Sequence, residues 1–288
     1  MSQTMTADIE TTYQAWIACI QERRSADLQA LTHETFEYSS GAHTLHYADL
    51  VAHTNGFLDI RGEDVRVTLN GIISGPGESL VAQLYVDCRP IEPLLGVEPK
   101  GDVIRFFQQQ IVSLKDGRVT KVLAVTDFDH VRRQLSGEQD RGEPDDIEPR
   151  HAAGGLTSAE LDRLYRDYIA CINENLTEAG LSQFCQPIVV HSRKELTLER
   201  YCALIQESSS AVQDMTAHIH TLVAQEQSQR VGVRLEWSGT PITTLQGVEP
   251  NGRNVRFPEH VIYQLESGKI ARVWSIVDWE EFRRQMSE

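Results

Sequence analysis

The strongest constraint on the fold of this chain is an internal repeat. Residues 96–135 align with residues 247–286 at a constant offset of 151, without a gap, and 15 of the 40 aligned positions are identical. A second pair of matching segments, WIACI at residues 16–20 and YIACI at residues 168–172, lies near the start of each half at an offset of 152. A period of this length is too long for a solenoid and predicts two whole domains of the same fold.

The segment between the two halves is predicted to be a linker. Residues 137–155 read GEQDRGEPDDIEPRHAAGG, and proline, glycine and acidic residues of this kind cannot build an apolar core. We therefore predict a first domain over residues 1–136, an acidic Pro/Gly linker over residues 137–155 and a second domain over residues 156–288.

The pattern of apolar residues within a half predicts helices first and strands last. Leu161, Tyr165 and Tyr168 recur at helical spacing, and a second helix is expected over residues 198–206. Short turns separate the strand-like runs, so neighbouring strands should be antiparallel. The expected fold class is α+β, with helices packed on one face of a curved antiparallel sheet. The strands are expected at residues 215–225, 230–239, 254–265 and 269–277, with a final helix from Trp279.

Charge and composition exclude several classes of function. The 288 residues carry a formal net charge of -15 at pH 7, and such an acidic surface repels nucleic acids and anionic lipids, so neither is an expected partner. The N-terminal residues lack the pattern of a signal peptide, and no apolar stretch reaches membrane-spanning length, which predicts a soluble, cytoplasmic protein. The five cysteines include no closely spaced pair, so neither a disulfide framework nor a metal site is expected.

The second half carries further features in a fixed order. These are RVGVRLEWSGT at residues 230–240, GVEPNGRNVRF at 247–257 and YQLESGKIARVWSIVDWEEFRRQM at 263–286. The order resembles that of the SnoaL-like polyketide cyclases of the nuclear transport factor 2-like superfamily, with their glycine-proline-glycine turn, apolar strand, acidic-Gly-Lys-Ile hairpin and Trp-x-x-x-Asp strand end. The first half matches less well, because Leu123 stands where the second half has Trp274.

The resemblance implies cone-shaped domains, each with an apolar pocket between its helices and its sheet. Family members act on small hydrophobic molecules as cyclases, isomerases, dehydratases or epoxide hydrolases, commonly without a cofactor and often as homodimers. The tandem copy therefore resembles a dimer fused into one chain, an internal pseudo-dimer that could form a further homodimer. No cofactor and no metal are expected.

The resemblance also implies positions for catalytic groups. Related enzymes combine a base that removes a C–H proton with donors that hold the enolate oxygen. None of the matching positions here carries a carboxylate, which favours ring closure directed by the shape of the pocket. In the second half, the helix tyrosine of the family falls on Tyr168, the base on Ser192 beside His191, the strand acid on Val261, and the aspartate after the family's tryptophan on Ser275. In the first half, the same four positions fall on Trp16, on Ser39 beside Tyr38, on Gln110 and on Ala124.

Glu259 and His260 differ from the first half, which has Gln108 and Gln109 at the same places. Side chains alternate along a strand, so Glu259 should face the pocket and His260 should face away, unless Pro258 marks a bulge. A buried glutamate or a histidine could act as acid or base. The structural alternative, a sheet edge or a domain interface, is equally favoured. The glutamines of the first half cannot exchange protons at neutral pH.

Asp278 and Asp127 occupy equivalent positions, which suggests a shared role. Asp278 precedes Glu281 by three residues at the start of a helix, and this spacing favours helix capping over catalysis.

We therefore expect a cofactor-independent cyclase or isomerase acting on a small hydrophobic polyketide- or terpenoid-type intermediate. The alternatives are a non-catalytic module that binds or chaperones such a molecule, and an epoxide or ester hydrolase. The catalytic candidates are Tyr168, His191, Ser192, Glu259, His260, Ser275 and Asp278. The substrate-binding candidates are Trp16, Tyr38, Ser39, Gln108, Gln110, Asp127, Trp237 and Trp274.

Overall fold

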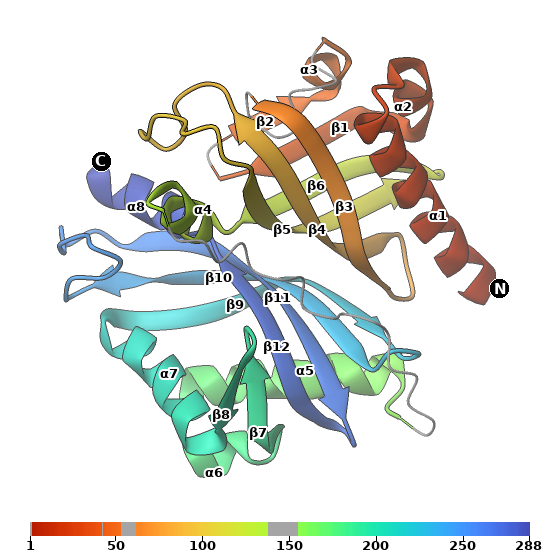
Figure 1. Ribbon diagram of the computed structural model, residues 1–288. Helices are drawn as coiled ribbons and strands as arrows, with labels where there is room; N and C mark the ends of the chain where they lie inside the picture. The colour runs from red at the N-terminus through yellow and green to blue at the C-terminus, as the bar shows by residue number, and fades with distance from the viewer. Residues whose placement is uncertain (1, 42, 53–61, 138–154) are drawn as a thin grey trace. The chain divides into compact units, whose positions relative to one another are not determined.

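The computed structural model of the protein (Figure 1) describes residues 2–41, 43–52, 62–137 and 155–288. The chain divides into two compact units, a first unit of Met1–Ile147 and a second unit of Glu148–Glu288. The predicted linker falls, over residues 138–154, outside the described residues. In the part of the chain that is described, no helix is both long enough and apolar enough to cross a membrane.

The first unit contains one six-stranded sheet with the strand order β2-β1-β6-β5-β4-β3. Its elements in chain order are α1 (Ser2–Gln21), α2 (Ser25–Leu31), β1 (Thr32–Ser40), β2 (His43–His46), α3 (Tyr47–Ala52), β3 (Gly62–Ser74), β4 (Ser79–Pro90), β5 (Ile104–Lys115), β6 (Arg118–Thr126) and α4 (Phe128–Leu135).

The second unit repeats this plan in the order β8-β7-β12-β11-β10-β9, which confirms that the repeat encodes one fold twice. Its elements are α5 (Ser158–Glu174), α6 (Glu178–Leu181), β7 (Cys185–His191), β8 (Lys194–Thr197), α7 (Leu198–Ser210), β9 (Val212–Gln225), β10 (Arg230–Pro241), β11 (Val255–Glu266), β12 (Lys269–Val277) and α8 (Trp279–Ser287).

The α+β class is confirmed, but each sheet is mixed and not purely antiparallel. The four long strands of each unit run antiparallel to their neighbours, as predicted. Short turns join all of them except β4 to β5 and β10 to β11, which are connected by the longer segments 91–103 and 242–254. Within each unit the first strand also pairs with the last strand, β1 with β6 and β7 with β12, and both of these pairs are parallel. Two strands joined by a short turn must be antiparallel. Strands that are distant in sequence can pair in either orientation, because the long connection between them can enter the second strand from either end.

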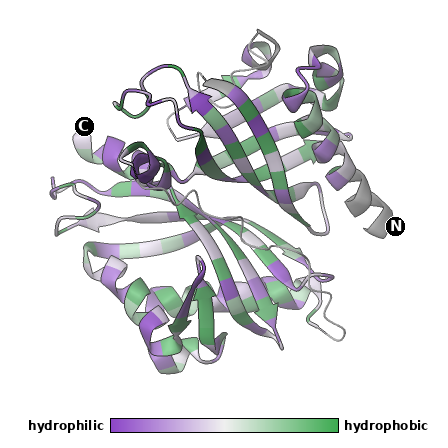
Figure 2. Cartoon of the chain, viewed as in Figure 1, coloured by the Kyte–Doolittle hydropathy of each residue, from purple (hydrophilic) through white to green (hydrophobic). Residues whose placement is uncertain are grey.

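Helix α5 shows how the sequence specifies the helical layer of the second unit. Thr157 accepts a hydrogen bond from the backbone N–H of Glu160, and the Glu160 carboxylate accepts one from the N–H of Thr157, which forms a capping box at the start of the helix. Its buried face carries Leu161, Tyr165 and Tyr168. Helices α5 and α7 lie on the same side of the β9–β12 sheet (Figure 1), and hydrophobic residues run in bands along both sheets (Figure 2).

The shared Gly-Val-Glu-Pro-x-Gly frame forms the same turn in both units. Gly96 and Gly247 have φ angles of 78° and 77°, and Gly101 and Gly252 have φ angles of 84° and 76°. These angles lie in the left-handed region that glycine adopts without strain. The frame therefore repeats because each unit needs the same connection between its second and third long strands, β4 to β5 and β10 to β11.

Candidate functional site

A cavity of about 190 Å³ lies in the second unit, between helices α5 and α7 and one face of the sheet. Most of its wall is aliphatic or aromatic, so a ligand inside it would lose most of its contact with water. The lining residues are Tyr168, Ile169, Ile172, His191, Tyr201, Leu204, Ile205, Ser208, Ser209, Met215, Leu235, Trp237, Phe257, Glu259, Tyr263, Val273, Ser275, Val277 and Trp279.

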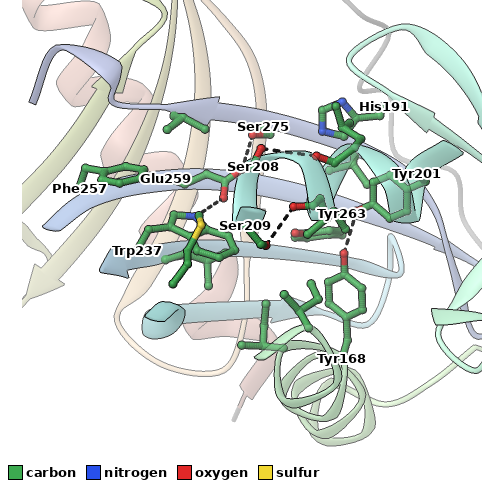
Figure 3. Close-up of a pocket in the computed structure, with 18 of the residues that line it drawn as sticks. Tyr168, His191, Tyr201, Ser208, Ser209, Trp237, Phe257, Glu259, Tyr263 and Ser275 are labelled. Carbon is green, nitrogen blue, oxygen red and sulfur yellow. Dashed lines mark hydrogen bonds between the residues drawn. The ribbon is translucent and has the colours of Figure 1, made fainter. Parts of the chain in front are cut away.

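Glu259 supplies the carboxyl group of this cavity (Figure 3). Its Oε2 accepts a hydrogen bond of 2.6 Å from the indole Nε1 of Trp237, and its Oε1 accepts one from the hydroxyl of Ser275. Burial raises the pKa of the Glu259 carboxyl above its ordinary value, while the two hydrogen bonds act in the opposite direction. The cavity therefore contains one oriented carboxyl group that can hold or release a proton.

The strand register places Glu259 inside and His260 outside, as alternation predicts. Phe257, Glu259 and Tyr263 share the face of β11 that lines the cavity. His260 is fully buried on the opposite face, where its Nε2 lies 2.9 Å from Nη1 of Arg234 on β10. Pro258 therefore does not shift the register, since β10 and β11 pair without interruption from Arg230 to Gly239.

Three tyrosine hydroxyls accompany the carboxyl group. The hydroxyls of Tyr168 on α5 and Tyr201 on α7 form a hydrogen bond of 2.8 Å (Figure 3), and the ring of Tyr263 contacts the ring of Tyr168 edge-on at 5.9 Å. Burial raises the pKa of all three phenols well above the ordinary tyrosine value. They therefore remain protonated at neutral pH and can donate hydrogen bonds to an oxygen atom of a ligand.

His191 lies at the end of β7 and also lines the cavity, close to the ring of Tyr201. Burial lowers the pKa of its imidazole, and the positive charge of Lys194 lowers it further. The ring is therefore neutral at neutral pH, with one nitrogen able to donate and the other able to accept.

Several sequence-predicted residues lie outside the cavity. Ser192 occupies the tight turn after β7 with a φ of 45°, and its N–H donates to the carbonyl of Val273. Trp274 faces away from the cavity, because its neighbours Val273 and Ser275 face into it, and its ring contacts the guanidinium of Arg230 at 5.6 Å.

Asp278 and Asp127 cap helices, as their spacing predicted. Asp278 accepts a hydrogen bond of 3.0 Å from the N–H of Glu281 at the start of α8, and Asp127 accepts one of 2.8 Å from the N–H of His130 at the start of α4. Burial raises the pKa of Asp278 to about 6.

The first-half candidates mostly bond to one another. Gln110 and Gln108 are buried neighbours joined by a hydrogen bond of 2.5 Å, and Gln108 also donates to the hydroxyl of Tyr38 at 3.5 Å. Trp16 is fully buried and donates its indole N–H to Thr32. Ser39 is half-buried on β1, paired in register with Leu123. A substrate-binding role for these residues stays a prediction.

Two tyrosines of the cavity could have been found from sequence. Tyr263 shares the inward face of β11 with Glu259, so the alternation that selected one selects the other. Tyr201, Leu204, Ile205 and Ser208 follow the i, i+3, i+4, i+7 spacing of one helix face.

For the described ranges, no group of three or more His, Cys, Asp or Glu side chains is arranged to hold a metal ion.

Comparison with known families supports this description of the second unit. Residues 162–286 match a family model described as SnoaL-like polyketide cyclase, so the second unit is a SnoaL-like domain. The first unit has the same strand order. The comparison with curated proteins gave no match.

Solved structures similar to this chain include three bacterial proteins. A SnoaL-like polyketide cyclase from Agrobacterium tumefaciens strain C58 aligns at 28% identity with a TM-score of 0.42, over 46% of this chain and 99% of the other. TsrD from Streptomyces laurentii aligns at 24% identity and a TM-score of 0.42, over 46% of this chain and 97% of the other. AclR from Streptomyces galilaeus aligns at 20% identity and a TM-score of 0.40, over 46% of this chain and 98% of the other.

Proposed function

We propose that the second unit is a cofactor-independent cyclase or isomerase that acts on a small, hydrophobic, carbonyl-containing intermediate of the polyketide or terpenoid type. The observation that carries the proposal is the half-buried Glu259 carboxyl group, which lies in a largely apolar cavity together with the buried hydroxyls of Tyr168, Tyr201 and Tyr263. The SnoaL-like polyketide cyclase match of residues 162–286 supports the same class of reaction.

The first step is removal of a proton from a carbon next to a carbonyl group. The ionised Glu259 takes this proton, and the electron pair of the broken C–H bond moves onto the carbonyl oxygen as an enolate. A raised pKa makes the carboxylate a stronger base than an exposed glutamate, and a substrate that fills the largely apolar cavity displaces water from around it. The tyrosine hydroxyls donate hydrogen bonds to the enolate oxygen and stabilise its charge.

The second step closes the ring. The enolate carbon attacks a second carbonyl carbon that the cavity wall holds nearby, a new C–C bond forms, and the resulting alkoxide takes the proton back from Glu259. Atoms and charge balance without an oxidant, a reductant or water, so the product is an isomer of the substrate. Shape remains important, because the wall must bring the two carbons together before the proton moves.

Trp237 and Ser275 orient the carboxyl group for this work. Each binds a different oxygen of Glu259, so rotation of the carboxyl plane would break at least one hydrogen bond.

An epoxide or ester hydrolase is less well supported, because hydrolysis of that kind calls for paired carboxylates and Glu259 is the single carboxylate among the described lining residues.

The test uses a neutral triketone, 2-methyl-2-(3-oxobutyl)cyclohexane-1,3-dione, whose aldol ring closure gives a chiral bicyclic product. We expect the protein to accelerate closure and to favour one enantiomer. Glu259→Gln keeps the size of the side chain and removes its basicity, so the rate should fall by about 10²–10⁴-fold. Chiral chromatography measures both the rate and the enantiomeric excess.

The matched control is Glu236→Gln, which removes a carboxylate from the neighbouring strand β10 on the face opposite to Trp237. This variant should close the ring as fast as the wild type does. A racemic product, or equal rates for the wild type and Glu259→Gln, would contradict the proposal and would favour a module that binds the intermediate without converting it.

A further inference from the structure

Four buried side chains of the first unit form one continuous hydrogen-bond chain, which we name the amide chain. The hydroxyl of Tyr13 on α1 donates to Oε1 of Gln110 at 2.7 Å, and Nε2 of Gln110 donates to Oε1 of Gln108 at 2.5 Å. Nε2 of Gln108 then donates to the hydroxyl of Thr126 at 2.9 Å. The chain crosses the inner face of β5 from the helix to strand β6 and fills that space with polar atoms that satisfy one another.

The second unit does not form this chain, because three of its four positions carry different residues. The repeat places Tyr165, Val261, Glu259 and Val277 where the first unit has the four members of the amide chain. Val261 offers no polar atom, and the Tyr165 hydroxyl, buried like its counterpart, interacts with the hydroxyl of Tyr263 instead. Its electrostatic neighbours are the side chains of Tyr263, Glu259 and Tyr201, three of the residues that line the cavity.

The difference in side-chain length matters because the two positions are otherwise alike. Gln110 and Val261 lie at the same place on β5 and β11, and both are buried against the opening helix of their unit. A glutamine is long enough to span from strand to helix, as Gln110 does toward Tyr13, whereas a valine ends next to its own strand. The neighbouring helix position adds to the contrast, since Trp16 is larger than its counterpart Tyr168.

We propose that the residue pair 110 and 261 decides which unit holds a ligand: Gln110 closes the interior of the first unit, and Val261 leaves the interior of the second unit open. The chain accordingly takes up one small, uncharged cyclic ligand that carries a hydroxyl or carbonyl group. This inference concerns uptake alone, so it does not depend on the reaction proposed above.

Calorimetric titration of the full chain with 2-naphthol tests the inference. We expect one 2-naphthol to bind per chain. Val261→Gln should rebuild the chain from Tyr165 to Glu259 and weaken uptake by roughly tenfold or more, because the amide occupies the ligand's space. The melting temperature should stay close to that of the wild type, since Tyr165 and Glu259 are the repeat counterparts of Tyr13 and Gln108, the two partners of Gln110.

Two further variants distinguish the filling of the second unit's interior from misfolding of the protein. Val261→Met has a side chain of similar length without an amide and should also weaken uptake, which covers the case in which Val261→Gln does not fold. Val261→Ala shortens the same side chain and should retain uptake. A wild type that binds one 2-naphthol but does not close the triketone ring would contradict the proposed reaction alone, so failure of uptake and failure of catalysis are distinguished.

Three results would overturn the inference. The first is a stoichiometry of two 2-naphthol molecules per chain, which would show that Gln110 does not close the first unit. The second is a folded Val261→Gln or Val261→Met variant that binds as tightly as the wild type does. The third is a wild type that takes up no 2-naphthol at its solubility limit.

Discussion

At the scale of single residues, the environment of Glu259 determines what its carboxyl group can do. Burial favours the neutral form and raises the pKa, while Trp237 and Ser275 each favour the ionised form. A base must be ionised, so its activity should appear only as the pH rises through this raised pKa, above the range in which an exposed glutamate ionises.

The probe 5-nitrobenzisoxazole measures this titration directly. A base removes the proton from its ring carbon, the N–O bond breaks, and a coloured phenolate forms. We expect the rate to rise with pH along a single ionisation curve whose midpoint lies above the ordinary glutamate pKa of 4.5. Trp237→Phe removes one hydrogen bond to the ionised form and should move the midpoint higher. A profile that is flat for the wild type, or a midpoint that falls in Trp237→Phe, would contradict this assignment.

Asp278 shows the same balance, because burial raises the pKa of its carboxyl group while the hydrogen bond from the N–H of Glu281 lowers it. The folded-state pKa of about 6 lies above the ordinary value of 3.8, so the folded protein binds this proton more tightly than the unfolded chain does. Stability contributed by the proton is present below about pH 4 and is lost as the pH rises through about 6. The difference between the two pKa values corresponds to roughly 3 kcal/mol.

Asp278→Asn isolates this contribution, since the amide oxygen can still accept the N–H of Glu281. We expect the variant to gain free energy of unfolding relative to the wild type as the pH rises from about 4 to about 7. Urea denaturation at several pH values measures the difference. Parallel pH curves for the two proteins would show that Asp278 does not titrate as proposed.

Local patterns predicted some of these residues and not others. Alternation along β11 was sufficient to place Glu259 and His260 on opposite faces, and the Asp-x-x-Glu spacing was sufficient to identify Asp278 as a cap. Ser192 was misplaced because the resemblance supplied a strand position, whereas the chain turns there in a left-handed conformation. The helix-face spacing of Tyr201 is visible in the sequence, but its approach to Tyr168 is not, since that depends on how two helices pack.

At the scale of elements, the four long strands of the second unit were predictable because each is a run of apolar and β-branched residues bounded by a turn. Strand β12 matches its predicted range of 269–277, and α8 begins at Trp279 as expected. The parallel pairing of β7 with β12 was not predictable. No turn links β7 to β12, so this pairing is decided by the packing of the whole unit.

The link between helix α1 and strand β5 can be tested by removing Gln110. Gln110→Val leaves the Tyr13 hydroxyl and the Gln108 carbonyl without their bonds to Gln110, and we expect the variant to lose about 1–3 kcal/mol of unfolding free energy. Adding Tyr13→Phe removes the orphaned hydroxyl, so the double variant should lose less than the sum of the two single losses. Urea denaturation of the three variants measures this coupling, and strictly additive losses would contradict it.

At the scale of the whole molecule, the duplication separates what the fold requires from what a ligand requires. The turn glycines, the capping aspartates and the strand order are the same in both units. The side chains that differ include those on the inner faces of the sheets, where Glu259 and Ser275 correspond to Gln108 and Ala124 in the repeat. A comparison of the two halves therefore indicates functional positions within one sequence.

The hydrogen bond from the Trp237 indole to Glu259 has one more consequence. An indole N–H bound to a carboxylate absorbs and emits light differently from one bound to a neutral carboxylic acid, because the nearby charge shifts the energy of its excited state. Each proton that Glu259 gains or loses is therefore reported by a chromophore 2.6 Å away. The protein contains its own optical indicator of the group on which its chemistry is proposed to depend.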